Sequence, residues 1–292
     1  MNHKILKEIT SISVGTLILI AGASAMPQNV KPIKPLVVHA SSRAEQTRII
    51  VPKGYTADLI EDWKDDPNNA HVTRKLQRLS RQGMISNRFY DQTINDNRKV
   101  DLNNLSSNDQ YELSQYALTL INSIRTQLGL PEFVYTASAQ NFANDIAKAY
   151  NEDNWSDYQG HDISAINNVA KMHGLTHAGD NEYEDMAGFD MTTGHQYATI
   201  YQVKQGIYYN IKQFAFGGFQ YHNWKESDKQ NLNYYTEWYH ANDLFAGDYS
   251  QEFALSLSYL IQDPTNKVNK ITSSHYIHVD PENIEKKSLY EK

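Results

Sequence analysis

Two histidines near the C-terminal end of the sequence, His275 and His278, are of a type and spacing that could do chemistry. They lie in the stretch ITSSHYIHVD, residues 271–280, in which apolar and polar residues alternate as in a β-strand. Side chains three positions apart in a strand point to opposite faces of the sheet. The two imidazoles therefore cannot belong to one site unless the strand is bulged. Other parts of the sequence are needed to identify which histidine is functional.

The composition excludes several kinds of chemistry. The chain has 292 residues and no cysteine, and it contains neither a Gly-x-Ser-x-Gly nucleophile motif nor a His-Glu-x-x-His zinc helix. Its net charge of -7 argues against a nucleic-acid surface. Hydrophobic residues make up 40% of the chain, which is enough to form a substantial core without disulfides.

The first 25 residues have the order of a secretory signal peptide. Lys4 and Lys7 precede an uncharged run from Ile9 to Ala25, which ends in small residues. We expect cleavage after Ala25, or alternatively after Ala40, and a retained membrane anchor is the competing interpretation. Cysteine-free secreted chains are common in Gram-positive bacteria. The mature protein is therefore expected to be extracellular or noncovalently associated with the cell wall, with no transmembrane anchor.

The chain divides by composition into four parts after the signal peptide. Residues 26–50 lack periodicity and are expected to be a linker, and residues 51–104 contain short amphipathic helices that form an N-terminal extension. Residues 105–280 hold the strongly periodic, capped elements, and residues 281–292 form a charged tail. This distribution predicts that the main domain folds without the extension.

The main domain is predicted to be α+β. A long helix begins after Ser106, which has a capping-box relation to Asp109, and ends at Gly129. Further helices are expected at 138–153, 162–175, 195–214 and 231–247. Residues 252–262 then alternate strictly, and residues 271–279 return as their antiparallel partner. Several helices followed by a C-terminal hairpin are typical of α+β domains.

Four stretches together resemble the CAP (SCP-like) superfamily. The first is YALTLINSIRTQLGLP, with Asn122, Arg125 and the Gly-Leu-Pro that starts at Gly129; the others are YEDMAGF, EWYHANDLF and SSHYIHV. The resemblance covers about residues 107–280. It implies a CAP-like α-β-α sandwich with a C-terminal antiparallel hairpin, preceded here by the short helical extension.

A narrower resemblance includes the N-terminal extension. The stretches IIVPKGYTADL and GHDISAINNVAKMHGL, together with those above, look like the PgrA-type surface-exclusion proteins of Gram-positive lactic-acid bacteria. This implies a protein that interacts at the cell surface with a partner protein or a wall polymer. Some relatives limit conjugative plasmid uptake between cells.

The CAP resemblance also implies a site. CAP proteins often carry two histidines and two glutamates in a cleft, and His161, Glu184 and His275 match three of these positions. Two imidazoles and a carboxylate suit a divalent metal, zinc above all, with a position left for water. The same three residues are therefore candidates both for metal binding and for catalysis by a metal-assisted hydrolase, which is the alternative to a binding module.

The fourth position of the site departs from the family pattern. Three residues after Trp238 stands Ala241, which cannot bind a metal. Glu237 and His240 are nearby and are weaker candidates for the missing ligand.

Plainer interpretations stand beside this site. His275 could be a hydrogen-bonded core histidine. His278 is expected to be an ordinary surface residue. The aromatic stretch 216–240 could stack on sugars, or its rings could belong to the helix core.

Overall fold

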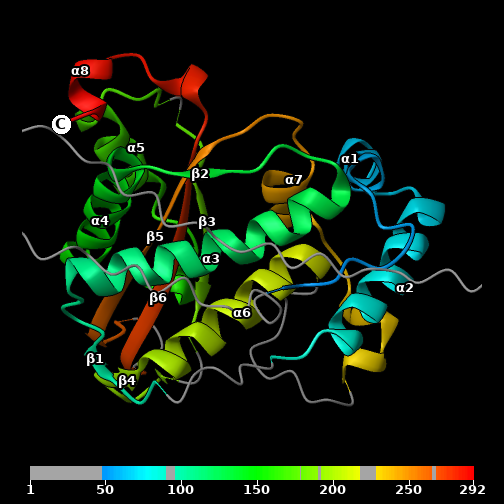
Figure 1. The fold of residues 1–292 in the computed structure, drawn as a ribbon, viewed down its shortest axis with the longest axis horizontal. Coiled ribbons are helices and arrows are strands. Elements are labelled where there is room, and N and C mark those ends of the chain that lie inside the picture. Colours follow the sequence, from blue (N-terminus) through cyan, green and yellow to red (C-terminus); the bar gives the residue numbers. More distant parts are fainter. Residues whose placement is uncertain (1–47, 90–95, 178, 190–191, 218–227, 265–267) are drawn as a thin grey trace, which may run out of the picture. The chain divides into compact units, whose positions relative to one another are not determined.

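The computed structural model describes residues 48–89, 96–177, 179–189, 192–217, 228–264 and 268–292 (Figure 1). All of them belong to one compact unit, residues 43–292. The expected signal peptide and most of the expected linker lie outside the described residues.

A four-stranded sheet forms the centre of the fold. Its strands, in the spatial order β2-β5-β6-β3, are β2 (Val134–Tyr135), β5 (Glu252–Gln262), β6 (Asn269–Val279) and β3 (Glu184–Gly188). β5 and β6 pair antiparallel, with Ser256 opposite His275 and Phe253 opposite His278, and this confirms the predicted C-terminal hairpin. β3 pairs antiparallel with β6 and is an edge strand.

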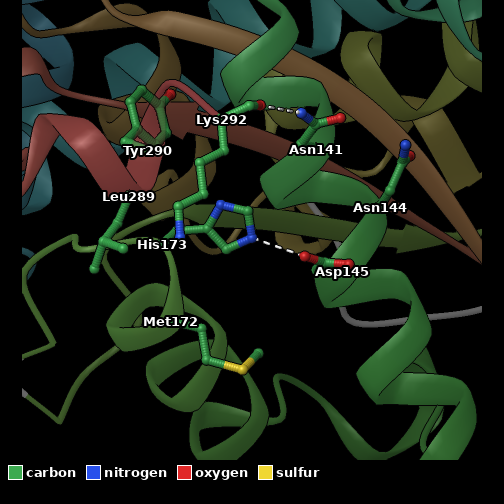
Figure 2. A pocket seen from close by; sticks show the side chains of 8 residues that line it. All are labelled: Asn141, Asn144, Asp145, Met172, His173, Leu289, Tyr290 and Lys292. Carbon is green, nitrogen blue, oxygen red and sulfur yellow. Dashed lines mark hydrogen bonds and ion pairs between the residues drawn. The ribbon is translucent and has the colours of Figure 1, made fainter.

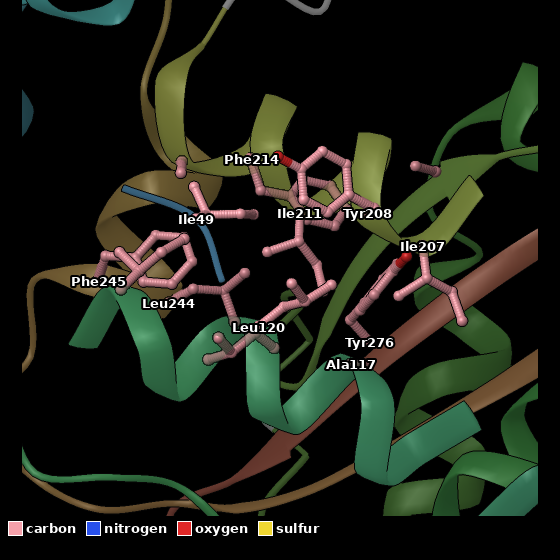
Figure 3. Packing of buried hydrophobic residues seen from close by; sticks show 14 of the residues in the cluster. Ile49, Ala117, Leu120, Ile207, Tyr208, Ile211, Phe214, Leu244, Phe245 and Tyr276 are labelled. Atoms are coloured by element: carbon pink, nitrogen blue, oxygen red, sulfur yellow. The ribbon is translucent and has the colours of Figure 1, made fainter. Parts of the chain in front are cut away.

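Helices cover both faces of the sheet. α4 (Ala137–Glu152) and α5 (Ile163–Met172) share a hydrophobic cluster with Ile277 and Val279 of β6. α3 (Ser107–Leu128), α6 (Ile200–Phe216) and α7 (Tyr239–Phe245) share another cluster with Tyr276, and Figure 3 shows part of that packing. Because consecutive side chains of β6 enter different clusters, the sheet is buried on both sides. The predicted α-β-α sandwich is confirmed.

Local signals account for the ends of α3. The Ser106 side chain accepts a hydrogen bond from the backbone N–H of Asp109, and Gly129 ends the helix in the left-handed region with φ 78°. Two other helix predictions were too long. Residues Tyr197–Thr199 form β4, which pairs with β1 (Lys99–Asp101), so α6 begins only at Ile200.

The helix expected at 231–247 is also shorter than predicted. A 3₁₀ turn, η4 (Leu232–Tyr234), precedes a loop, and α7 begins at Tyr239. The loop is held by long-range contacts, since Trp238 is fully buried and its indole Nε1–H donates to the Ser80 hydroxyl at 2.8 Å. Part of the aromatic stretch 216–240, residues 218–227, lies outside the described residues.

The N-terminal extension packs into the same core as the main domain. α1 (Ala57–Asp65) and α2 (Ala70–Ser86) contribute buried residues to the cluster that holds α3, α6 and α7. The ring of Trp63 lies 5.2 Å from that of Trp238, edge to face. The boundary expected near residue 105 therefore does not separate two hydrophobic cores.

The expected charged tail is docked on the domain. It contains η5 (Pro281–Asn283) and α8 (Lys287–Tyr290). Tyr290 is buried, and its hydroxyl donates to Glu252 at 2.9 Å. Figure 2 shows the pocket of 470 Å³ between α4, the end of α5 and α8, where His173 Nε2 lies 2.8 Å from an Asp145 carboxylate oxygen.

Candidate histidine–carboxylate site

Two consecutive carboxylates of the edge strand β3 form the centre of the candidate site. Glu184 and Asp185 are neighbours, so their side chains point to opposite faces of the sheet. Both side chains are buried, with exposed fractions of 0% and 1%. Buried carboxylates require hydrogen-bonding or charged partners, and here the partners are histidines.

Glu184 joins two histidines on the face covered by α4 and α5. Its Oε1 lies 2.6 Å from His275 Nδ1, and its Oε2 lies 2.8 Å from His161 Nδ1. The Tyr150 hydroxyl donates to Oε2 at 2.6 Å. The structure therefore brings together the three residues that the CAP resemblance singled out.

The remaining nitrogen of His275 is also engaged. His275 Nε2 lies 2.7 Å from the Ser258 hydroxyl oxygen, and the imidazole itself is fully buried. An ionised Glu184 requires a proton on Nδ1 of His275, and Nε2 pairs with the Ser258 hydroxyl, which can donate or accept a hydrogen bond. His275 thus satisfies both ring nitrogens inside the core.

Asp185 joins two other histidines on the opposite face. Its Oδ1 lies 2.5 Å from His240 Nδ1, and its Oδ2 lies 3.3 Å from His278 Nε2. The prediction that His278 is an ordinary surface residue was wrong, because it is 7% exposed and faces the buried Asp185. Both faces of β6 are covered by helices, so its second histidine is buried as well.

We call these six residues the histidine–carboxylate cluster: His161, Glu184, Asp185, His240, His275 and His278. In each half, one histidine belongs to β6, and the other lies at or just before the N-terminus of a helix. His161 directly precedes Asp162, the N-cap of α5, and His240 lies in the first turn of α7. Their rings approach to 6.5 Å, and their side chains are 28% and 21% exposed. The two halves therefore meet at the surface through His161 and His240.

Comparison with solved structures identifies the fold. The structure is similar to the "CAP domain of Enterococcal PrgA", with a TM-score of 0.59 and 24% sequence identity over 82% of this chain and 89% of that one. The chain has the CAP fold. No family model matches the sequence, and no curated protein does.

The fourth candidate position and its neighbours lie in α7 and in the residues just before it. Ala241 is fully buried in α7. The Glu237 carboxylate accepts a hydrogen bond from the backbone N–H of Tyr239 at 2.9 Å, and His240 binds Asp185. Neither Glu237 nor His240 completes a ligand set with His161, Glu184 and His275.

The Asp185 half of the cluster was missed by the sequence analysis, although the sequence contains a signal for it. An acidic pair at consecutive strand positions, Glu184 and Asp185, presents one carboxylate to each face. Histidines three apart in the partner strand, His275 and His278, also present one ring to each face. Antiparallel pairing of these two strands then gives each carboxylate one histidine.

The zinc site expected from the CAP resemblance does not fit this arrangement. Both ring nitrogens of His275 and both carboxylate oxygens of Glu184 already have protein partners. Within the described ranges, no group of three or more His, Asp or Glu side chains is arranged to hold a metal ion. We therefore derive no chemistry from a metal at these residues.

The cluster changes the acidity of its members. Burial alone raises the pKa of the Glu184 carboxyl, but the charge of His275 and the hydrogen bonds from both histidines outweigh it and hold the pKa at about 2. Burial likewise opposes ionisation of Asp185, but His240 and His278 lower its pKa to about 2. Burial lowers the pKa of His240, whereas the hydrogen bond and charge of Asp185 raise it more, so the net shift is upward.

Glu184 and His240 are together expected to contribute most to stability between about pH 4.5 and 6.5. A carboxyl with a depressed pKa contributes fully above its usual value, 4.5 for Glu184, and the contribution is lost as the pH falls towards 2. A histidine with a raised pKa contributes fully below its usual value, 6.5 for His240, and the contribution is lost as the pH rises through the raised value. Urea midpoints measured from pH 3 to 9 test this, and a midpoint that stays constant down to pH 3 contradicts it.

Proposed function

We propose that this protein is an extracellular binding module of the surface-exclusion type, whose recognition face is centred on His161 and His240. It meets a partner protein or a wall polymer at the cell surface. The observation that carries this proposal is the geometry of the cluster. Two buried carboxylates each hold one histidine that reaches solvent, and the two rings lie 6.5 Å apart.

The same geometry favours recognition over hydrolysis. Ser258, His275 and Glu184 are hydrogen-bonded in the order of a serine-hydrolase triad, with distances of 2.7 and 2.6 Å. However, all three residues are buried, with at most 3% exposed. A nucleophile must reach the substrate, and the Ser258 hydroxyl is enclosed by the core. This triad-like arrangement therefore serves to support His161 through Glu184.

Fixed imidazoles suit a recognition surface. A side chain that is already held in one orientation loses little conformational entropy when it binds a partner. His161 is held by Glu184, whose Oε2 lies 2.8 Å from His161 Nδ1. His240 is held by Asp185 and packs against Phe214, with ring centroids 4.7 Å apart. The pair is thus preorganised for contact with polar groups of a partner.

An extracellular location is supported by the signal-like order of residues 1–25. No helix in the described part of the chain combines the length and the apolar character that a membrane span requires.

Binding of the labelled protein to intact cells of the producing organism tests the proposal. We expect that the double substitution His161→Ala and His240→Ala weakens cell binding about tenfold, as for the loss of a central contact pair. His173→Ala is a matched control, because His173 also pairs with a carboxylate, that of Asp145, and neither residue belongs to the cluster (Figure 2). Circular dichroism verifies that each variant is folded.

Two outcomes contradict the proposal. The first is equal loss of binding in the His173→Ala control and in the double variant. The second is hydrolysis of a cell-surface substrate that disappears when Ser258 is replaced with alanine in a folded protein.

A further inference from the structure

Helix α2 concentrates positive charge in an acidic protein. Residues 70–89 contain no aspartate or glutamate, while the whole chain has a net charge of -7. The cations of this segment are Arg74, Lys75, Arg78, Arg81 and Arg88. A local field of this sign attracts anions even when the overall charge is negative.

The helical period gathers most of these cations on one outer face. Arg74, Arg78 and Arg81 are spaced four and three residues apart, and like charges at such spacings destabilise a helix. The inner face of α2 is fixed by packing, since Leu76 and Met84 are buried. The repulsive arrangement is therefore retained on the exposed side of a well-anchored helix, where a bound anion would relieve it.

A pocket of 510 Å³ lies on this face. It is lined by Arg78, Arg81, Gln82, Ile85, Ser86 and Gln230. The lining provides two guanidinium groups, two amides and a hydroxyl, all of which can donate hydrogen bonds. Among the described residues, no aspartate or glutamate lines the pocket and none forms an ion pair with either arginine.

We propose that this pocket binds a phosphate ester group of a phosphodiester-linked cell-surface polymer. Planar guanidinium groups match phosphate oxygens with two parallel hydrogen bonds, and the neighbouring amides and hydroxyl supply the additional donors. The choice of a surface polymer over a nucleic acid rests on the proposed extracellular location and on the net charge of -7. The pocket is distinct from the histidine–carboxylate cluster.

Calorimetric titration of the full mature chain tests this inference. The probes are inorganic phosphate, glycerol 3-phosphate and poly(glycerol phosphate), with glycerol as the uncharged control. We expect all three phosphates to bind and the polymer to bind most tightly, because it offers many phosphate groups. Replacing both arginines, Arg78→Ala and Arg81→Ala, is expected to weaken binding at least about tenfold.

Matched variants separate the pocket from general charge. Arg88→Ala removes one cation just beyond the end of α2, outside the pocket lining, and is expected to change affinity less than about twofold. Arg78→Lys with Arg81→Lys keeps the charge but removes the paired donors, so it is expected to bind less tightly than the unaltered chain. The double variant of His161 and His240 is expected to bind phosphate normally, so the two proposals fail independently.

Three results overturn the inference. The first is the absence of binding for all three phosphate probes. The second is equal affinity of the Arg78→Ala, Arg81→Ala variant and the unaltered chain. The third is tight binding of a single-stranded DNA oligonucleotide through the same arginines without binding of poly(glycerol phosphate), which assigns the pocket to nucleic acid.

Discussion

Replacing Glu184 with alanine is expected to destabilise the protein by about 3–5 kcal/mol, the usual cost of removing one partner from a buried charged network. The Glu184 side chain is fully buried and is the common partner of His275, His161 and Tyr150. Its removal leaves the Nδ1 of the fully buried His275 without a partner inside the core. Typical domains have a total stability of about 5–15 kcal/mol, so the variant is expected to be close to unfolding.

Urea denaturation followed by circular dichroism measures this effect. Glu182→Ala is the matched control, because Glu182 lies two residues earlier on the same segment and is exposed. We expect the control to change the free energy of unfolding by less than about 1 kcal/mol. A Glu184→Ala variant that is as stable as the control would show that the cluster contributes little to the fold.

Removing residues 48–104 is expected to abolish cooperative folding. This segment contributes nine buried residues to the cluster that also holds α3, α6 and α7: Ile49, Tyr55, Leu59, Ile60, Trp63, Leu76, Met84, Val100 and Leu102. Full burial of a large apolar side chain contributes about 1.5–3 kcal/mol, so their combined loss exceeds the stability of a typical domain. The single substitution Trp63→Ala is expected to cost about 3–5 kcal/mol.

Near-ultraviolet circular dichroism and thermal unfolding measure both changes. A chain that starts at residue 48 is the control for the truncation, and Glu61→Ala, at an exposed position of α1, is the control for Trp63→Ala. Cooperative unfolding of a chain that starts at residue 105 would contradict this expectation. It would mean that the extension only covers a core that is already complete.

Elements with strong local signals could be predicted from the sequence. The capping of α3 by Ser106 and its end at Gly129 depend on residues within a few positions of each other. The strict alternation of β5 and the return of β6 likewise defined the hairpin and the opposite directions of His275 and His278. The resemblance to CAP proteins then added His161 and Glu184. In the structure, the carboxylate of Glu184 contacts both His161 and His275.

Features that depend on long-range packing could not be predicted in the same way. The extension joins the core because Trp63 and Trp238, far apart in the sequence, meet edge to face. The tail packs on the domain, where the Tyr290 hydroxyl donates a hydrogen bond to Glu252. The pairing of His240 with Asp185 depends on the relative positions of α7 and β3. No local pattern contains that information, so the hydrophobic periodicity of single segments underestimates the size of the core.

The position of the ring proton in His161, His240 and His275 is the most direct test of the cluster. Long-range ¹H–¹⁵N nuclear magnetic resonance spectra at pH 7 distinguish protonated from unprotonated ring nitrogens for each imidazole. We expect His161, His240 and His275 to carry a proton on Nδ1, hydrogen-bonded to Glu184 or Asp185. In the Glu184→Gln variant, the Nδ1 signals of His161 and His275 are expected to change, whereas that of His240 is expected to stay constant. An unprotonated Nδ1 in His161 and His275, or no response of either to Glu184→Gln, would contradict the arrangement on which the proposed recognition face depends.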